Sequence, residues 1–363
     1  MPPSDAAFQH YRIIRRRAES EVITSYWLAP ADGSAPPPFC PGQYLTLRLP
    51  GGEKPNRTYT VSSAPTERGS YRITVKREPS PPDRPDLPPG RGSGWLATHG
   101  EVGAELEVLG PRGAFVLDET SARPVLLLSG GVGLTPMVSM LHALAPTGRA
   151  THFIHACDHG GVHALRDEVL EAAARHPTVR PHFIYRVPRA SDRANSLFHS
   201  EGILTRALLQ RLLPLDDYDA YLCGPPGFMA AVYGMLRGLG VAAERIRYEF
   251  FGPATVLETT RTEPEVPSAP PPPEAGAAAP IQVVLARSGL AGVWDGASAT
   301  LLDFAEALGA RPDFSCRAGI CNTCECSLLA GEVTLTAEPL DPPAAGRVLP
   351  CIARPTTSVT LDL

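Results

Sequence analysis

The sequence has 363 residues, of which 43% are hydrophobic, and this length suits two or three globular domains. Its formal net charge of -5 gives no support for nucleic-acid binding, and no apolar run is long enough to cross a membrane. The 40 prolines and 33 glycines are many, but they stay below the level that signals wholesale disorder.

Short runs of alternating apolar and polar residues occupy the first third of the chain. Residues 44–49 and 71–76 are the clearest of these runs, and turns rich in proline and glycine separate them. This pattern is typical of an antiparallel β-barrel, and we assign the barrel to residues 1–119.

Three short segments of this barrel carry groups that suit a phosphate and a planar ring. Arg57, Tyr59 and Thr60 offer a cation, an aromatic face and a hydroxyl group. Two further segments supply a basic strand end and a glycine-rich phosphate-binding loop, namely Val75 with Lys76 and Gly92 with Ser93. Each segment alone is a weak signal that surface strands contain by chance, but in this order the segments reinforce one another.

From Pro124 onward, apolar runs alternate with helical stretches. The expected strands lie at 125–129, 151–155, 180–185 and 219–223, and the expected helices include 137–144 and 165–175. This alternation is typical of a parallel α/β sheet, which we assign to residues 120–258.

Two glycine-containing turns follow strands of this sheet. The residues that we expect to bind a dinucleotide there are Gly131, Gly133, Thr135 and Pro136 in the first turn and Cys223, Gly224 and Pro225 in the second. A glycine-rich turn before a helix lets backbone N–H groups approach a pyrophosphate, and a small thiol can lie against a nicotinamide ring. The alternatives are a purely structural turn and a buried cysteine at a strand end.

Residues 259–280 are rich in proline and alanine and contain no aromatic residue. This composition favours a semi-extended linker, which separates residues 281–363 as a further domain. Such a linker would let that domain move between an internal electron donor and an external acceptor.

The last domain contains four cysteines with the spacing C-x4-C-x2-C followed by a distant cysteine: Cys316, Cys321, Cys324 and Cys351. This is the ligand run of a plant-type [2Fe–2S] cluster. The small residues Ala318 and Gly319 allow the loop to pass close to the cluster. A structural zinc site is disfavoured because it usually has a second pair of close ligands.

The remaining cysteines are scattered as free thiols would be: Cys40, Cys157, Cys223 and Cys326. The first residues, Met-Pro-Pro-Ser-Asp, lack the apolar segment of a signal peptide. We therefore expect a cytoplasmic protein without structural disulfides, in which Cys326 is a core residue of the strand after the cluster loop.

Four closely spaced histidines are the other group that could bind a metal: His152, His155, His159 and His163. The first two lie on or beside a strand with a spacing that does not suit a site, and the others follow in a glycine-rich loop. Hydrogen-bonded or solvated histidines are therefore the expectation.

Taken in order, several motifs resemble the ferredoxin–NADP reductase superfamily. They are Arg57-x-Tyr59-Thr60, Gly92-Ser93, the turn from Gly131 to Pro136, Cys223-Gly224-Pro225 and Tyr248-Glu249-Phe250-Phe251. The C-terminal ferredoxin-like segment gives the domain order of the phthalate dioxygenase reductase class, and the reductase half is more similar to that of flavohaemoglobins. The resemblance implies a flavin-binding barrel, an NAD(P)-binding α/β domain and an α+β ferredoxin domain of the β-grasp type.

The resemblance also implies roles for individual residues. Arg57 would contact the flavin phosphate region, Tyr59 the isoalloxazine ring and Thr60 the region near N5, while Gly92 and Ser93 would hold the phosphate. The first glycine turn would bind the pyridine nucleotide, Cys223 would lie near the nicotinamide, and Phe250 or Phe251 would cover the flavin. Serine is more usual than threonine at position 60, but the hydroxyl group is retained.

These features predict an NAD(P)H-dependent reductase. A flavin accepts a hydride and releases single electrons, so it can connect a nicotinamide donor to a one-electron cluster and then to an oxygenase or haem protein. The alternatives are a flavin oxidase or diaphorase that reduces oxygen or small acceptors, and a redox sensor or carrier. We favour FAD over FMN, and NADH over NADPH, although Arg186, Arg189 or Arg193 could bind a 2′-phosphate.

Overall fold

The computed structural model describes residues 8–49, 56–79, 91–250, 280–294, 296–310, 324–339 and 342–363, together with residues 312, 314, 317, 319 and 322. Its internal contacts divide the chain into two compact units, Met1–Phe251 and Gly252–Leu363. The predicted linker, 259–280, lies almost wholly outside the described residues.

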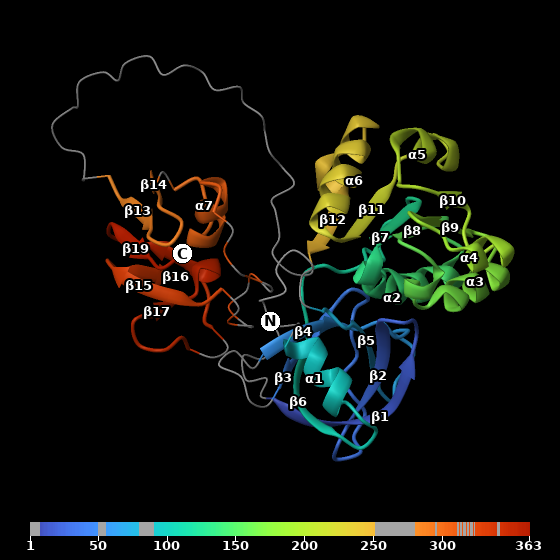
Figure 1. The fold of residues 1–363 in the computed structure, drawn as a ribbon, viewed down its shortest axis with the longest axis horizontal. Helices are drawn as coiled ribbons and strands as arrows, with labels where there is room; N and C mark the ends of the chain where they lie inside the picture. Colours follow the sequence, from blue (N-terminus) through green and yellow to red (C-terminus); the bar gives the residue numbers. More distant parts are fainter. Residues whose placement is uncertain are drawn as a thin grey trace. The chain divides into compact units, whose positions relative to one another are not determined.

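Six antiparallel strands in the first unit form a sheet with the order β4-β3-β6-β1-β2-β5. Their bounds are β1 (Gln9–Ala18), β2 (Ile23–Pro30), β3 (Tyr44–Arg48), β4 (Asn56–Thr60), β5 (Tyr71–Lys76) and β6 (Glu105–Arg112). A bridge between Val61 and Ile73 brings the chain after β4 back to β5, so the sheet closes into a barrel (Figure 1). The predicted antiparallel barrel is confirmed.

The alternation of side chains explains how these strands enclose a core. In β1, the buried Tyr11 and Ile13 alternate with the exposed Arg12 and Ile14, as expected for a strand with one face toward a core. Helix α1 (Arg91–His99) packs on the barrel through Leu96, which is fully buried in the same core.

The second sheet of the first unit is parallel, with the order β10-β9-β8-β7-β11-β12. Its strands are β7 (Val125–Gly130), β8 (Thr151–Cys157), β9 (Val179–Tyr185), β10 (Ser200–Glu201), β11 (Asp219–Gly224) and β12 (Ile246–Phe250). The helices between them are α2 (Leu134–Leu144), α3 (Arg166–Arg175), α4 (Ala190–Ala194), α5 (Arg206–Leu212) and α6 (Pro226–Gly238). Every residue of β7 and β11 is buried, as expected for central strands of a parallel sheet. The predicted α/β domain is confirmed.

The strand order creates a point at which the chain changes direction along the sheet. From β7 the chain adds β8 and β9 on one side, and it then returns to add β11 and β12 on the other side of β7. Ligands of open α/β sheets bind at the carboxyl ends of the strands beside such a point. The two predicted glycine-containing turns follow β7 and β11, so the fold brings them to this position (Figure 1).

The second unit contains a five-stranded sheet with the order β14-β13-β19-β15-β17 and a two-stranded sheet of β16 and β18. The strands are β13 (Gln282–Leu285), β14 (Leu290–Val293), β15 (Cys326–Ala330), β16 (Val333–Leu335), β17 (Arg347–Val348), β18 (Ala353–Pro355) and β19 (Val359–Leu361). Helix α7 (Leu301–Ala307) packs on the main sheet, and its buried Leu301 and Phe304 share a core with Val283 and Leu361. This arrangement is the predicted α+β domain.

Among the described residues, no helix is both long enough and apolar enough to span a membrane.

Candidate cofactor sites

Three of the residues predicted to bind the flavin lie against one another in the barrel. Arg57 and Tyr59 belong to β4, and the start of α1 places Gly92 directly on them. A Cβ atom added to Gly92 would lie 2.7 Å from Cγ of Arg57 and 2.7 Å from the hydroxyl oxygen of Tyr59. Only glycine fits this close approach, so the two segments form one site although they are distant in sequence.

Thr60 provides a direct test of whether this region suits a flavin. Its side chain is buried, and its Oγ1 atom makes no hydrogen bond with any of the described residues. A buried hydroxyl group without a partner is costly, and a ligand that hydrogen-bonds to it removes that cost. The hydroxyl therefore fits a nitrogen or oxygen atom of a bound ring system, as predicted for the flavin.

The other residues predicted to bind the flavin have different surroundings. Val75 is buried in the barrel core, and Lys76 forms an ion pair with Glu78 at 3.0 Å. The Ser93 hydroxyl accepts a hydrogen bond from the backbone N–H of Glu78. The end of β5 and the start of α1 are therefore tied together, and the phosphate-binding roles of these residues stay predictions.

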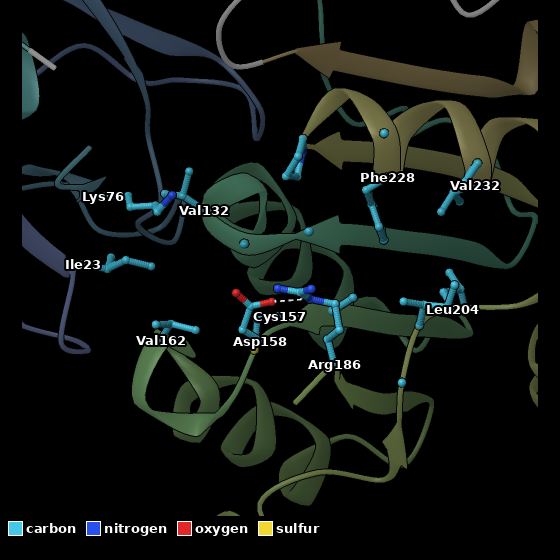
Figure 2. A pocket seen from close by; sticks show the side chains of 18 of the residues that line it. Ile23, Lys76, Val132, Cys157, Asp158, Val162, Arg186, Leu204, Phe228 and Val232 are labelled. Carbon is cyan, nitrogen blue, oxygen red and sulfur yellow. Dashed lines mark hydrogen bonds and ion pairs between the residues drawn. The ribbon is translucent and has the colours of Figure 1, made fainter. Parts of the chain in front are cut away.

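A cavity of about 470 Å³ opens beside the turn after β7 (Figure 2). Gly131 and Val132 line one side, and Phe228 and Val232 project into it from α6. Further lining residues come from the end of β8, the segment after β9, and the barrel strands β2 and β5. The cavity has a mainly apolar wall, and its charged lining residues are Lys76, Asp158 and Arg186. Its position beside the two glycine-containing turns suits a bound dinucleotide.

The predicted nucleotide-binding residues divide into two groups around this cavity. Gly131 and Pro225 line it, whereas Gly133, Thr135, Pro136, Cys223 and Gly224 lie behind its wall. A Cβ atom on Gly133 would lie 2.3 Å from the carbonyl oxygen of Cys223, so this glycine permits close packing of the turn on β11. Thr135 uses its hydroxyl group to donate a hydrogen bond to the carbonyl of Val132. Gly133 and Thr135 therefore stabilise the conformation of the turn and do not line the cavity.

Cys223 has a partly buried acidic neighbour to which the sequence analysis assigned no role. Glu249 in β12 is the register partner of Cys223 in β11, and its Oε2 atom has no hydrogen-bond partner among the described residues. Burial raises the pKa of Glu249 to about 8, and burial together with this carboxyl raises the pKa of the Cys223 thiol well above its usual value. A glutamate between Tyr248 and Phe250 at the end of β12 was the available signal.

The expected aromatic cover cannot be placed. Phe250 ends β12, but its side chain lies outside the described residues, as does all of Phe251.

Each arginine considered for a 2′-phosphate forms an ion pair with a carboxylate. Arg186 pairs with Asp158 at 2.7 Å, and Arg189 pairs with Glu21 through both of its terminal nitrogens. A third pair joins Arg193 to Glu201. Of these three arginines only Arg186 lines the cavity, where Figure 2 shows its side chain against Asp158.

Two of the four predicted cluster ligands are described, and they lie in the same small core. Cys324 and Cys351 are both buried, beside Phe314 and Ile352. Cys316 and Cys321 lie outside the described residues, as does Ala318. Cys326 begins β15 and packs in the main core of the unit, as predicted.

The loop that carries the cluster cysteines is held to α7. Arg317 donates hydrogen bonds to Asp303 at 2.8 Å and to both carboxylate oxygens of Glu306 at 2.7 Å, and its guanidinium lies 4.1 Å from the Phe314 ring centroid. Gly319 has a φ of +68°, and a Cβ atom there would lie 2.6 Å from Cδ1 of Ile352. Glycine therefore suits both the backbone conformation and the packing against Ile352 at this position, while the close approach to a cluster stays a prediction. The anchoring role of Arg317 had no signal in the spacing of the cysteines.

Comparison with known families assigns a cofactor to each part of the chain. Residues 36–117 match the oxidoreductase FAD-binding domain, residues 127–233 the oxidoreductase NAD-binding domain, and residues 294–356 the 2Fe-2S iron-sulfur cluster binding domain. The FAD/NAD-binding domain of nitric oxide dioxygenase from Vibrio cholerae is 34% identical, with a TM-score of 0.59. That match covers 68% of this chain and 99% of that domain.

The chain belongs to the ferredoxin–NADP reductase superfamily. It is an oxidoreductase with FAD-binding, NAD-binding and [2Fe–2S]-binding domains in that order. Phthalate dioxygenase reductase has the same order; it is 25% identical, with a TM-score of 0.58, and the match covers 98% of both chains.

The reductase half of this superfamily member is also similar to flavohemoproteins. Those of Burkholderia sp. and Pseudomonas aeruginosa are 44% and 43% identical over 248 and 252 residues, which cover 68% and 69% of this chain. The matched region spans 60% of the length of each of these two relatives.

Proposed function

We propose that this chain is the reductase component of a multi-protein oxidation system. It takes electrons from NADH, passes them through FAD and a [2Fe–2S] cluster, and delivers them singly to a separate oxygenase or haem protein. The observation that carries the proposal is the end-to-end match to phthalate dioxygenase reductase, a modular structure for electron transfer from pyridine nucleotides to [2Fe–2S]. We place the reaction in the cytoplasm, where reduced thiols such as the exposed Cys40 persist.

The cofactors supply the electron chemistry, because bound FAD takes a hydride and gives up single electrons that the cluster can accept. The chain positions them. Arg57 and Gly92 hold the phosphate region of FAD, with Ser93 beside them, while Tyr59 packs on its ring. The buried Thr60 hydroxyl, which lacks a partner among the described residues, hydrogen-bonds to the ring near N5. Thr60 and Cys223 are the residues that we place at the reacting atoms.

The nicotinamide enters the cavity beside the turn after β7. Gly131 and Pro225 form part of its wall there, and Phe250 or Phe251 would cover the flavin. The apolar lining excludes water from the path of the hydride. Cys223 and the neutral carboxyl of Glu249 keep negative charge away from this region, because burial favours their protonated forms.

NADH is the preferred donor in this proposal. The cation that lines the cavity after β9, Arg186, is neutralised by Asp158, and that carboxylate would repel a 2′-phosphate. Lys76 also lines the cavity, but it is paired with Glu78. The Asp158 carboxylate can also accept hydrogen bonds from the ribose hydroxyl groups of NADH.

The four cysteines Cys316, Cys321, Cys324 and Cys351 hold the cluster. Arg317 supports this site because it fastens the ligand loop to α7 through Asp303 and Glu306. Such supporting contacts fix ligand geometry around a metal centre.

The delivery of electrons to a protein partner is tested with cytochrome c as a one-electron acceptor. We expect NADH oxidation to rise at least tenfold when cytochrome c is added, and the Cys351→Ala variant, which lacks a cluster ligand, to lose most of this increase. An NADH oxidation rate in air that cytochrome c leaves unchanged would show a flavin oxidase instead.

A further inference from the structure

Two histidines and a cysteine converge on one face of the parallel sheet in the nucleotide-binding domain. His155 and Cys157 are two residues apart in β8, so their side chains lie on the same face of the strand. His163 follows the short 3₁₀ helix Gly160–Val162, and its ring lies 4.5 Å from that of His155, centroid to centroid. The sequence spacing predicted hydrogen-bonded or solvated histidines, and both of these histidines are hydrogen-bonded through Nδ1, but their convergence with Cys157 was not predicted.

The two imidazoles are held by the same kind of contact. Nδ1 of His155 hydrogen-bonds with the hydroxyl of Ser129 at 2.9 Å, and Nδ1 of His163 hydrogen-bonds with the hydroxyl of Tyr185 at 2.8 Å. Ser129 and Tyr185 lie in the neighbouring strands β7 and β9, as register partners of His155 and Cys157. The parallel sheet therefore fixes the direction of both rings.

The other nitrogen of each ring, Nε2, is buried without a hydrogen bond to any described residue. His155 is fully buried and His163 is 95% buried. Within the same residues, one ligand atom from each of the two histidines and Sγ of Cys157 all lie within 4.8 Å of one another. Two buried nitrogen atoms without partners are costly unless something binds them.

We propose that His155, Cys157 and His163 bind a divalent cation of the zinc class, at a site separate from the iron–sulfur cluster. Imidazole nitrogen and thiolate sulfur are the ligands that Zn²⁺ prefers, and three protein ligands leave a fourth position for water. With a metal bound at Nε2, each ring would carry its proton on Nδ1 and donate a hydrogen bond to the hydroxyl of Ser129 or Tyr185. A hydrogen bond at the ring nitrogen that does not bind the metal commonly orients metal-binding histidines in this way.

The groups around Cys157 favour the binding of a cation. Its thiol donates a weak hydrogen bond to the carbonyl of His159 at 3.6 Å, and this is the proton that the metal would displace into solution. The carboxylates of Asp158 and Asp192 add negative potential at the sulfur, while Arg166 opposes it on the side of His163. Cys157 also lines the nucleotide cavity, which gives the ion a path from solvent (Figure 2).

Metal binding is tested on the full chain loaded with FAD and its cluster. The protein is dialysed against a chelator and then titrated with Zn²⁺ against a chromophoric competitor, while the flavin and cluster absorption bands are monitored to show that both cofactors remain. Elemental analysis then counts zinc per FAD. The Cys157→Ser variant removes the sulfur with little change of shape, and Cys40→Ser removes an exposed thiol as the matched control.

We expect the wild type and Cys40→Ser to bind one Zn²⁺ per FAD, and Cys157→Ser to bind it about tenfold more weakly or worse. Equal zinc affinity in Cys157→Ser and the wild type, or no zinc bound by the wild type, would overturn the proposal.

Cobalt(II) provides a second measurement that needs no variant of the buried residues. Added to the wild type, it should give the visible bands of a four-coordinate ion and a thiolate-to-cobalt band in the near ultraviolet, above the cofactor spectrum. Cys40→Ser should keep the thiolate band. A six-coordinate cobalt spectrum without that band would contradict the site, whether or not Cys157→Ser folds.

Discussion

Arg72 of the barrel and Glu168 of the nucleotide-binding domain form a two-pronged ion pair, with both nitrogen–oxygen distances at 2.7 Å. Arg72 also donates hydrogen bonds to the carbonyl and the hydroxyl of Ser62, and Glu168 is hydrogen-bonded to His142 of α2. Burial acts to raise the pKa of Glu168, but the hydrogen bonds from His142 and Arg72 outweigh it and lower the pKa to about 2. The pair joins β5 of the barrel to α3 of the nucleotide-binding domain, and both of these domains contribute residues to the cavity.

Loss of this pair should destabilise the first unit. Arg72 is almost fully buried, so Arg72→Ala leaves a carboxylate without its main partner, and we expect a loss of about 2 kcal/mol in the free energy of unfolding. Arg175→Ala, which breaks the exposed pair with Glu171, is the control and should cost about 0.3 kcal/mol. Urea unfolding followed by flavin fluorescence checks both values. Similar midpoints for the two variants would contradict the structural role of Arg72.

Glu249 should make stability depend on pH in a defined direction. Burial raises the pKa of its carboxyl to about 8 in the folded protein, whereas an unfolded glutamate has a pKa near 4.3. Between these values the folded state keeps a proton that the unfolded chain releases, so stability should fall as pH rises from about 4.5 to about 8.

In the Glu249→Gln variant the side chain cannot ionise, so the decrease in stability with rising pH should disappear. Urea midpoints measured at pH 5, 6.5 and 8 would reveal this. Glu244→Gln, at an exposed position nearby, should retain the decrease. Parallel pH curves for Glu249→Gln and the wild type would show that the carboxyl is already ionised in the folded protein.

Asp158 should set the choice between NADH and NADPH. Asp158→Ala frees Arg186 at the cavity wall, and one charge-assisted hydrogen bond to a 2′-phosphate is worth about 1.5 kcal/mol, or roughly tenfold. We therefore expect the ratio of kcat/KM for NADPH to that for NADH to rise about tenfold.

Glu201→Ala is the matched control for this prediction, because it frees Arg193, which does not line the cavity. Steady-state kinetics with each nucleotide measure the ratio. An equal rise of this NADPH/NADH ratio in both variants would show that the 2′-phosphate does not bind beside Arg186.

Local sequence patterns predict most of the strands because each strand has a simple environment. The uninterrupted apolar run at 125–128 in β7 is typical of a strand buried on both faces, and the strand lies where expected. The short strand β10 was not predicted, since two residues, Ser200 and Glu201, carry no periodic signal.

The candidate sites were harder to predict from the sequence than the strands, because the sites depend on contacts between distant segments. Motif order indicated Arg57, Tyr59 and Gly92 together, and the structure brings them into contact. Pairs such as Arg72 with Glu168, which are 96 residues apart, leave no local pattern. The convergence of His155 with His163 was missed for a related reason, since the loop between them follows a path that helix and strand periodicities do not encode.

The central claim is that electrons from NADH pass through the flavin to the cluster held by Cys324, Cys351 and their two partners. Anaerobic titration with NADH, followed by visible absorption, tests it most directly. We expect the wild type and Cys326→Ala, which alters a core cysteine beside the site, to lose both the flavin and the cluster bands. Cys351→Ala should lack the cluster bands from the start yet still bleach its flavin. Flavin bleaching in the wild type while the cluster bands stay unchanged would contradict the relay.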